Sequence, residues 1–530
     1  MPTRRTTVLL SAASLAAALG LTGCAVAATT SQNGQTTTAS TITIPGDLSA
    51  EATLAANSDA TTVNDDEWDA STASEVAASD DTVTITEAGV YRLSGDYTGG
   101  VVIDAGEDAL VVLILDGADI SNTEGPAIQV TSADDVGIFL EDGSSNTVSD
   151  AGTSYADDAD FHAAIASDAD LTISGTGALA VTASDDGIST SDDLVILSGT
   201  IEVAAGDDGL RGNDALVVKD GDITVDAANG DALKSDQDED ETQGWIEIAG
   251  GTLDLTSGDD GLDAQTDIVV TGGELTIDAT GDGMHSEAVL VIEGGEVTIT
   301  NSDEGIESFT ISIAGGTIDV TSSDDGLNAS GGTSTAGGGM ADGGQLLSIS
   351  GGTLTVNAQG DGLDSNGSIE MTGGTVEVQG PTNDGNGALD TNGAFTISGG
   401  TLVAIGSSGM AETPDADSAQ GFVSIGVTGQ AGSVVQVTDA DGDVVAEITA
   451  AKQFANIVVS TAEIIDGQTY TALVDGVAAG TGTAGEASSG MGGGQGGMGG
   501  GGQSNGGGQG GMGGGGQGSG NGQGGSGQRG

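Results

Sequence analysis

Residues 258–284 read GDDGLDAQTDIVVTGGELTIDATGDGM and contain one complete copy of the repeat that decides the fold. The Asp-Gly step that ends at Gly261 recurs at Gly283. Apolar and polar residues alternate between these steps, which is typical of strands with one buried face. Gly-containing corners separate three strand-sized runs, at 262–264, 268–271 and 274–279. Three strands and three corners per repeat predict one coil of a parallel β-helix.

The repeat recurs along the chain at a nearly constant interval, interrupted by insertions at 237–244 and 331–345. Its corner glycine falls at Gly187, Gly209, Gly261, Gly283, Gly305 and Gly326. One further repeat has Ala232 in place of this glycine. We expect the corner glycines to supply positive φ angles, which other residues adopt at a cost. Stacked repeats also predict an inward-facing column: Ile188, Leu210, Leu233, Leu262, Met284, Ile306, Leu327 and Leu363.

The domain organisation follows from where the repeat begins and ends. The predicted fold is all-β, with a three-sided parallel β-helix over residues 81–406. Alternating runs and Asp-Gly turns over 420–480 predict a small antiparallel β module that covers the C-terminal end of the helix. Residues 24–80 lack periodicity and predict a flexible tether. Residues 485–530 are rich in Gly, Gln and Met and predict a disordered tail.

The segment 1–23 has the features of a bacterial lipoprotein signal peptide. Arg4 and Arg5 precede an apolar segment over 8–21, and Leu21-Thr-Gly-Cys24 is typical of a lipobox. Cys24 is the single cysteine of the chain, which excludes internal disulfides. We therefore expect an extracellular protein whose membrane contact is a lipid on Cys24. The alternative is an ordinary signal peptide, cleaved near Ala27, which would remove Cys24.

The charge balance limits the partners of this protein. The chain has 81 Asp and Glu but 8 Lys and Arg, a formal net charge of -73. Nucleic acids and anionic membranes are polyanions and would be repelled. Metal cations are favoured, and the small number of His and Cys residues argues against soft metals.

Stacking of the Asp-Gly steps predicts columns of carboxylates about 4.8 Å apart, each neighbouring pair repelling by about 1 kcal/mol in water. Calcium takes six to eight oxygen ligands with loose geometry and would neutralise such columns. The alternative is that Asp-Gly is simply favourable turn chemistry. The candidate Ca²⁺ ligands are Asp185, Asp186, Asp207, Asp208, Asp231, Asp236, Asp259, Asp260, Asp263, Asp282, Asp324, Asp325, Asp361 and Asp364.

The few basic residues are candidates for contact with an acidic sugar. Arg211 and Lys234 occupy the same position in adjacent repeats, and Trp245 follows the nearby insertion. We predict these three as carbohydrate-binding residues. A base near calcium-bound uronate could remove the C5 proton, and Lys234 is the candidate for this β-elimination. The alternative is that Arg211 and Lys234 only neutralise the acidic column. Paired carboxylates are also what a glycosidase uses, so this class of enzyme is not excluded. With so many Asp residues, however, such pairs arise by chance and are not specific.

Several turns carry a resemblance to a known family: 184–188, 207–212, 230–236, 360–367, and the segment 380–390 followed by 395–400. Residues 80–475 resemble the bacterial carbohydrate-binding β-helix proteins first named for a cellulose- and pectin-binding clostridial surface protein. The resemblance implies a right-handed parallel β-helix, bound calcium, and binding of acidic or cellulosic plant polysaccharide. The fold is similar to that of the family-nine pectate lyases, which use calcium and a Lys base. Ala232 departs from the motif and puts the ligand geometry of the Lys234 repeat in doubt.

The sequence thus predicts a monomeric surface lipoprotein that binds acidic (pectin-like) or cellulosic polysaccharide with the help of Ca²⁺. Two alternatives stay open. The first is a calcium-dependent polysaccharide lyase, and the second is a structural or adhesive stalk whose repeats provide reach.

Overall fold

The computed structural model describes residues 46–64, 66–156, 159, 161–331 and 342–486. The predicted signal peptide, Cys24, the first part of the predicted tether, residues 332–341 of the second insertion and nearly all of the predicted tail lie outside the described residues. Within the described part, no helix has both the length and the hydropathy needed to cross a membrane.

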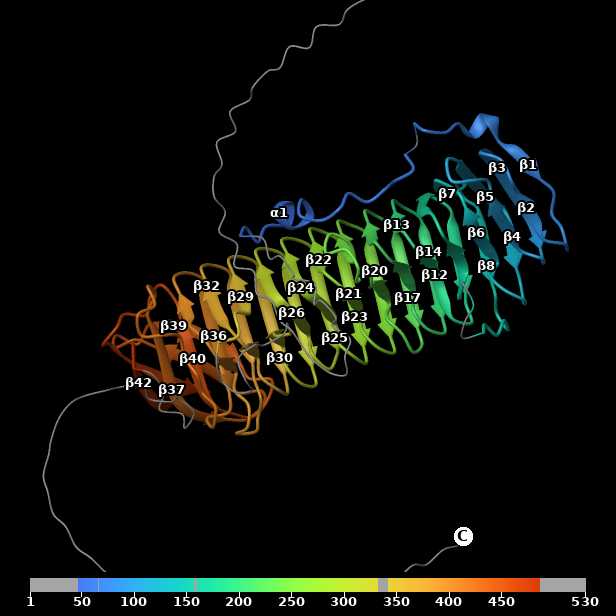
Figure 1. Cartoon of the computed structure of the whole chain (residues 1–530). Helices are drawn as coiled ribbons and strands as arrows, with labels where there is room; N and C mark the ends of the chain where they lie inside the picture. Colours follow the sequence, from blue (N-terminus) through green and yellow to red (C-terminus); the bar gives the residue numbers. More distant parts are fainter. Residues whose placement is uncertain (1–45, 65, 157–158, 160, 332–341, 487–530) are drawn as a thin grey trace, which may run out of the picture. The chain divides into compact units, whose positions relative to one another are not determined.

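A long stack of coils forms the body of the described chain (Figure 1). Each coil contributes a strand to three parallel sheets in turn, and each strand pairs with its equivalents in the preceding and following coils. The predicted strands of the model repeat lie at β21 (Leu262–Ala264), β22 (Asp267–Val270) and β23 (Glu274–Ala279). The prediction of a three-sided parallel β-helix is therefore confirmed.

The three sheets are named here by what lies on them. The acidic sheet contains β2 (Val83–Ile85), β4 (Val101–Asp104), β6 (Ile128–Ser132), β9 (Ala163–Ser167), β12 (Asp186–Thr190), β15 (Leu210–Gly212), β18 (Leu233–Ser235), β21, the first parts of β24 (Met284–Ile292) and β26 (Ile306–Ile313), β28 (Leu327–Ala329), β31 (Leu363–Ser365) and β34 (Leu389–Thr391).

The covered sheet contains β1 (Ser74–Val76), the first parts of β3 (Gly89–Tyr97) and β5 (Leu110–Ser121), β7 (Asp135–Leu140), β10 (Asp170–Gly175), β13 (Asp193–Ile196), β16 (Ala215–Val218), β19 (Trp245–Ile248), β22, the second parts of β24 and β26, β29 (Leu346–Ile349), β32 (Ser368–Met371) and β35 (Phe395–Ile397).

The third sheet contains the second parts of β3 and β5, β8 (Ser145–Ser149), β11 (Ala178–Thr182), β14 (Thr200–Ala205), β17 (Asp222–Ala227), β20 (Thr252–Ser257), β23, β25 (Glu296–Asn301), β27 (Thr317–Ser322), β30 (Thr353–Ala358), β33 (Thr375–Gln379) and β36 (Thr401–Gly406). The first paired strand, β1, begins at Ser74, somewhat before the predicted start of the helix at residue 81.

The interior is filled by aliphatic side chains from all three sheets. The predicted column from Ile188 to Leu363 lies inside the helix, and each member is at most 1% exposed. Register pairs such as Leu233 with Leu262 place its members directly above one another. Every coil adds aliphatic residues, and the aromatic side chains of this core, Tyr97 and Phe395, lie toward its two ends.

The predicted antiparallel module is present and closes the C-terminal end of the third sheet. β40 (Phe454–Ser460) pairs antiparallel with β36 and with β37 (Phe422–Gly429). A second sheet has the order β39 (Val444–Thr449), β38 (Val434–Thr438), β41 (Thr469–Val474) and β42 (Val477–Thr483). The segment between β36 and β37 covers the end of the covered sheet, because Asp415 and Gln420 donate backbone hydrogen bonds to the edge strand β35.

Residues 46–64 and 66–73, called the strap, run along the outer side of the covered sheet (Figure 1). The strap contains α1 (Ala50–Leu54) and a 3₁₀ turn, Ala70–Thr72. Ala50 packs against Val269 and Val291, and Val63 packs against Val112. The prediction of a flexible tether is therefore wrong for this segment, because its apolar side chains cover outward-facing valines of the sheet.

Candidate functional site

The Asp-Gly steps form an amide ladder along the edge of the acidic sheet. The backbone N–H of Asp231 donates to Asp208 Oδ1 at 2.9 Å, and that of Asp260 donates to Asp231 Oδ1 at 2.8 Å. The same bond joins Asp208 to Asp186, Asp282 to Asp260, Glu304 to Asp282, Asp361 to Asp325, and Gly387 to Asp361. One oxygen of each of these Asp carboxylates thus caps the next coil, as turn chemistry predicts. In the described structure no such bond joins Glu304 and Asp325, and Glu304 instead accepts a hydrogen bond from Asn328 Nδ2. Ala232 leaves the ladder intact in its own repeat.

The second carboxylate oxygens converge on one position beside the ladder. In the coil of β18 this position holds the Lys234 ammonium, with Nζ 2.6 Å from Asp231 Oδ2, 3.5 Å from Asp208 Oδ2 and 3.9 Å from Asp263 Oδ2. The surrounding carboxylates raise the pKa of Lys234 well above its usual value, against the opposing effect of burial. Lys234 therefore stays protonated at neutral pH, which argues against its predicted role as a base.

Arg211 neighbours Lys234 in the sheet register, as predicted. Its guanidinium forms a two-pronged ion pair with Asp236, with Nη2–Oδ1 2.9 Å and Nε–Oδ1 3.1 Å. It also donates to Ser189 Oγ at 3.2 Å. Asp236 is thus the partner of Arg211, and this correction removes it from the candidate metal ligands.

His285 supplies a third positive charge in the same column. Its Nδ1 lies 3.0 Å from Asp263 Oδ1. This hydrogen bond raises the pKa of His285 to about 9, although burial opposes the shift. The negative charge of the N-terminal part of the acidic column is therefore partly offset by three side chains: Arg211, Lys234 and His285.

Further along the column, the described coils from Glu304 to Asp390 bring no Lys, Arg or His to this position. Burial raises the carboxyl pKa of Glu304 and of Asp364 to about 8, and neighbouring carboxylates add to both shifts. Asp282, Glu304 and Glu307 each place a carboxylate oxygen within 4.8 Å of the others. Glu304 and Glu307 are absent from the predicted ligands, which contain Asp residues alone.

Asn328 lies among these carboxylates and is 7% exposed. Its Nδ2 donates to Glu304 Oε2 at 2.8 Å, while its Oδ1 is buried and accepts no hydrogen bond in the described structure. It is the register neighbour of Glu307 and of Asp364. Carboxylate and amide oxygens are the ligands that Ca²⁺ prefers, so these residues fit a calcium ion.

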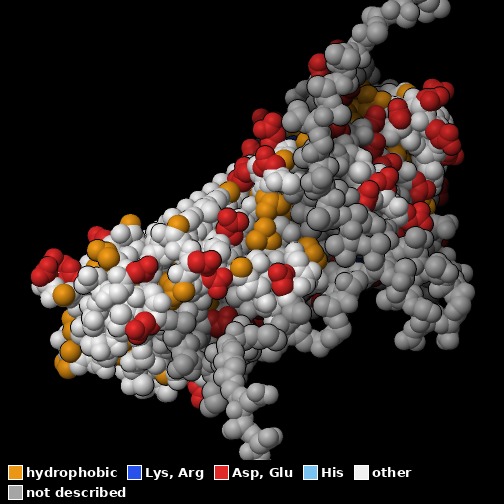
Figure 2. All heavy atoms as spheres, turned by 60° about the vertical axis from the view of Figure 1, so that its left-hand side comes forward, with side chains coloured by type: hydrophobic (Ala, Val, Ile, Leu, Met, Phe, Trp, Pro, Cys, Tyr) orange, Lys and Arg blue, Asp and Glu red, His pale blue; other side chains and the backbone are white. Residues whose placement is uncertain are grey.

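Some of the other predicted Ca²⁺ ligands lie beside the ladder, and some form clusters with ladder residues. Asp185, Asp207, Asp259 and Asp324 flank the ladder at its outer corner, and Asp185 also pairs with His162 at 2.9 Å. Clusters with oxygens within 4.8 Å of one another are Asp185 with Asp186 and Asp207, and Asp231 with Asp259 and Asp260. On the face drawn in Figure 2, Asp and Glu are widely spread and Lys and Arg are scarce.

Trp245 does not share a surface with Arg211 and Lys234. It begins β19 on the covered sheet and is 4% exposed, packed against Val195 and Val217 with Leu54 and Ala60 of the strap. Stacking on a sugar requires an open ring face. The prediction of Trp245 as a carbohydrate contact is therefore wrong, because the strap covers it.

Fold and site together define a parallel β-helix with a carboxylate ladder along one sheet. Residues 79–340 match the model of a family described as "Carbohydrate-binding domain-containing protein". A protein of that description from Acetivibrio thermocellus is 34% identical over 193 residues, which are 36% of this chain and 62% of that protein. The β-helical segment 79–340 is thus similar to this family, in line with the resemblance seen in the sequence.

The chain spans less than two thirds of the length of this curated relative. The chain is also similar to the solved structure of "the polysaccharide lyase-like protein from C. thermocellum, Gadolinium derivative". The identity is 34%, the match covers 41% of this chain and 89% of that chain, and the TM-score is 0.39.

Proposed function

We propose that the acidic sheet binds polysaccharide and that Ca²⁺ bridges its carboxylates to those of an acidic, pectin-like chain. One observation carries this proposal. The second oxygens of the ladder carboxylates converge on a cation position, which the Lys234 ammonium takes in one coil. In the next coils Asp282, Glu304 and Glu307 bring carboxylate oxygens within 4.8 Å of one another, and the described coils from Glu304 to Asp390 have no basic side chain in the column.

Calcium would be held at this cluster, by the carboxylates of Asp282, Glu304 and Glu307 and by the amide oxygen of Asn328. Since Ca²⁺ keeps six to eight ligands, such an ion retains positions for a uronate carboxylate. A bridging cation also offsets the repulsion between an acidic glycan and a protein of net charge -73. Arg211 and Lys234 supply positive charge further along the same face.

The test is retention of the full chain on immobilised polygalacturonate, in calcium and in EDTA. We expect binding in calcium and loss in EDTA. The double variant Glu304→Gln/Glu307→Gln should weaken binding by about tenfold or more, because two ligand charges are lost. Asp278→Asn is the matched control, since Asp278 is an exposed carboxylate of the third sheet. Undiminished binding in EDTA would contradict the calcium bridge.

The lyase alternative meets a physical obstacle on the acidic sheet. Lys234 and Arg211 are both held as cations by ion pairs, so neither is suited to remove a C5 proton. We expect no unsaturated product when polygalacturonate is incubated with the protein and calcium. Accumulation of such products, absent in Lys234→Ala, would establish the lyase instead.

A further inference from the structure

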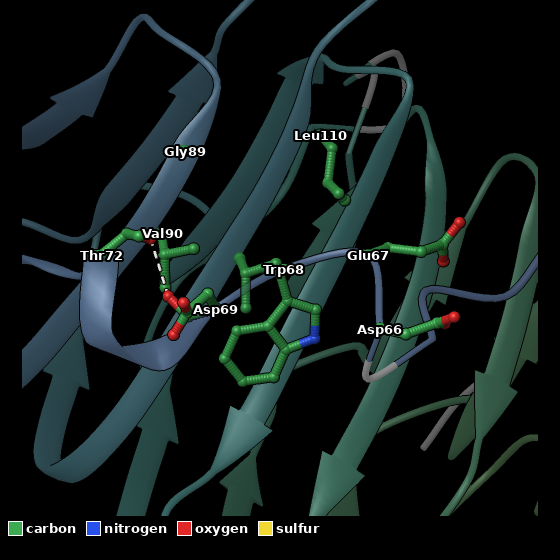
Figure 3. Close-up of a pocket in the computed structure, with 9 residues that line it drawn as sticks. Asp66, Glu67, Trp68, Asp69, Thr72, Gly89, Val90 and Leu110 are labelled. Carbon is green, nitrogen blue, oxygen red and sulfur yellow. Dashed lines mark hydrogen bonds between the residues drawn. The ribbon is translucent and has the colours of Figure 1, made fainter.

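A cavity of about 410 Å³ lies where the strap crosses the first strands of the covered sheet (Figure 3). Trp68 forms its aromatic wall, and Val90, Leu110 and Val112 form an apolar floor. The rings of Trp68 and Phe139 pack edge to face, with centroids 5.1 Å apart and planes at 63°. This contact fixes the Trp68 ring, and the side chain stays partly exposed.

The rim of this cavity is acidic. Figure 3 shows Asp69 on one side of the indole and Asp66 and Glu67 on the other. The carboxylate of Asp69 accepts the Ser71 backbone N–H at 2.8 Å, and that of Glu67 accepts the Asn64 N–H at 2.7 Å. The rim therefore offers hydrogen-bond acceptors and, among the described lining residues, no basic group.

A second cavity, of about 640 Å³, adjoins the first and shares Asp66 with it. Phe139 and Leu197 supply its apolar lining, and Ser174, Thr176 and Ser198 supply hydroxyl groups. Both volumes lie within the range of about 300–1,000 Å³ that small-molecule sites occupy. Two adjoining cavities along one surface suit a linear ligand of several units.

Near the first cavity, one buried acceptor has no partner. Asp135 is the register neighbour of Leu110, and its Oδ1 is buried and accepts no hydrogen bond in the described structure. A buried acceptor left without a donor is costly. Asp135 lines neither cavity, so water held beneath a bound ligand would supply the missing donor.

We propose that these two cavities form a second glycan site, which binds a neutral pyranose chain without calcium. The apolar C–H face of a pyranose matches the Trp68 ring and its apolar floor, and its hydroxyls are donors to the carboxylate rim. A uronate would be repelled by Asp66, Glu67 and Asp69. The strap residues that line the first cavity precede residue 79, so this wall lies outside the segment that matches the family model.

The test is titration of the full chain with cellohexaose in EDTA, followed by tryptophan fluorescence. The chain has two Trp residues, so the Trp245→Phe variant reports on Trp68 alone. We expect a saturable change in that variant. The Trp68→Ala variant is made in the chain that keeps Trp245, and its binding of cellohexaose is measured by calorimetry. We expect it to bind about tenfold or more weakly than the parent. Trp68→Phe should retain part of the binding.

Two further arms keep the test decisive. Asp66 is exposed, so Asp66→Asn leaves packing unchanged and should still weaken binding a few-fold. Asp278→Asn on the third sheet is the control and should bind as the parent does. The proposal is overturned if cellohexaose gives no saturable signal, if Trp68→Ala and Asp66→Asn bind normally, or if a Lys-rich peptide binds here instead. Because EDTA removes the calcium bridge, failure here is distinct from failure on polygalacturonate.

Discussion

The glycine of each Asp-Gly step has a steric role that differs from the expected one. At Gly261, an added Cβ would lie 2.4 Å from Cγ2 of Ile277 and 2.5 Å from the carbonyl oxygen of Gly283. Positive φ occurs instead at the Gly-Gly corners, for example 90° at Gly273. The Asp-Gly corner therefore excludes other residues by close approach of the next coil and of the third sheet.

Ala232 shows what permits an exception. The glycines at the other Asp-Gly steps face β-branched residues of the third sheet, such as Val225 opposite Gly209. In the repeat of Ala232 the corresponding position is Leu255, the register neighbour of both Val225 and Ile277. Leucine has no branch at Cβ, so it leaves more room beside the corner.

Gly261→Ala should consequently lower the free energy of unfolding by about 1–3 kcal/mol, as overpacking of a core does. Adding Ile277→Leu should restore a large part of this loss, while Ile277→Leu alone should cost less than about 1.5 kcal/mol. Urea denaturation of the four proteins measures the coupling. Equal losses for Gly261→Ala with and without Ile277→Leu would refute the steric explanation.

Among the elements, the strap is held by both apolar packing and specific hydrogen bonds. The Thr61 N–H donates to Asp193 Oδ2 at 2.8 Å, and the Val63 N–H donates to Thr172 Oγ1 at 2.9 Å. The Ala50 N–H donates to Glu293 Oε1 at 2.9 Å. These contacts turn a segment of low sequence regularity into the outer layer of one sheet.

Val63→Asp should therefore destabilise the protein by about 2–4 kcal/mol, because it places a charge at a site that is 5% exposed among valines and isoleucine. Ala55→Asp is the matched control, since Ala55 is an exposed strap residue. Thermal unfolding measures the loss, and a red shift of Trp245 emission in the Trp68→Phe background reports release of the strap. Equal melting temperatures for the two Asp variants would show that the strap packs weakly.

At the scale of the whole molecule, we expect the carboxylate ladder to make stability depend on pH and on calcium. Burial raises the pKa of Asp186, Asp260 and Asp361 to about 7. A carboxyl group whose pKa is raised in the fold binds more protons folded than unfolded, so stability falls as pH rises. Calcium binds the ionised carboxylates and should reverse this trend.

We expect the melting temperature in EDTA to fall by roughly 5–10 °C between pH 5 and pH 8. Excess calcium should have little effect at pH 5 and raise the melting temperature at pH 8. Magnesium is the control, because it requires stricter octahedral geometry. A melting temperature that rises with pH in EDTA would contradict the proposed effect of the buried carboxylates.

The candidate site was predictable to the extent that it follows from the repeat. Stacking alone predicted that Arg211 would neighbour Lys234 and that the Asp-Gly steps would form a column. It could not predict that one oxygen of each carboxylate caps an amide of the next coil, since this depends on side-chain geometry. Nor could it assign Asp236 to Arg211, because the partner lies outside the repeated positions.

The coil could be predicted from the sequence, since a nearly constant period with three alternating runs buries its aliphatic side chains in a stack of coils. Which outer faces are open became known from the packing of distant segments. Runs such as Ile268-Val-Val270 predict that both faces of the strand are buried, but they do not show which segment packs on the outer face. The strap supplies it, and therefore Trp245 is hidden while Trp68 borders a cavity. Accessibility depends on contacts between segments far apart in the chain, which no local pattern records.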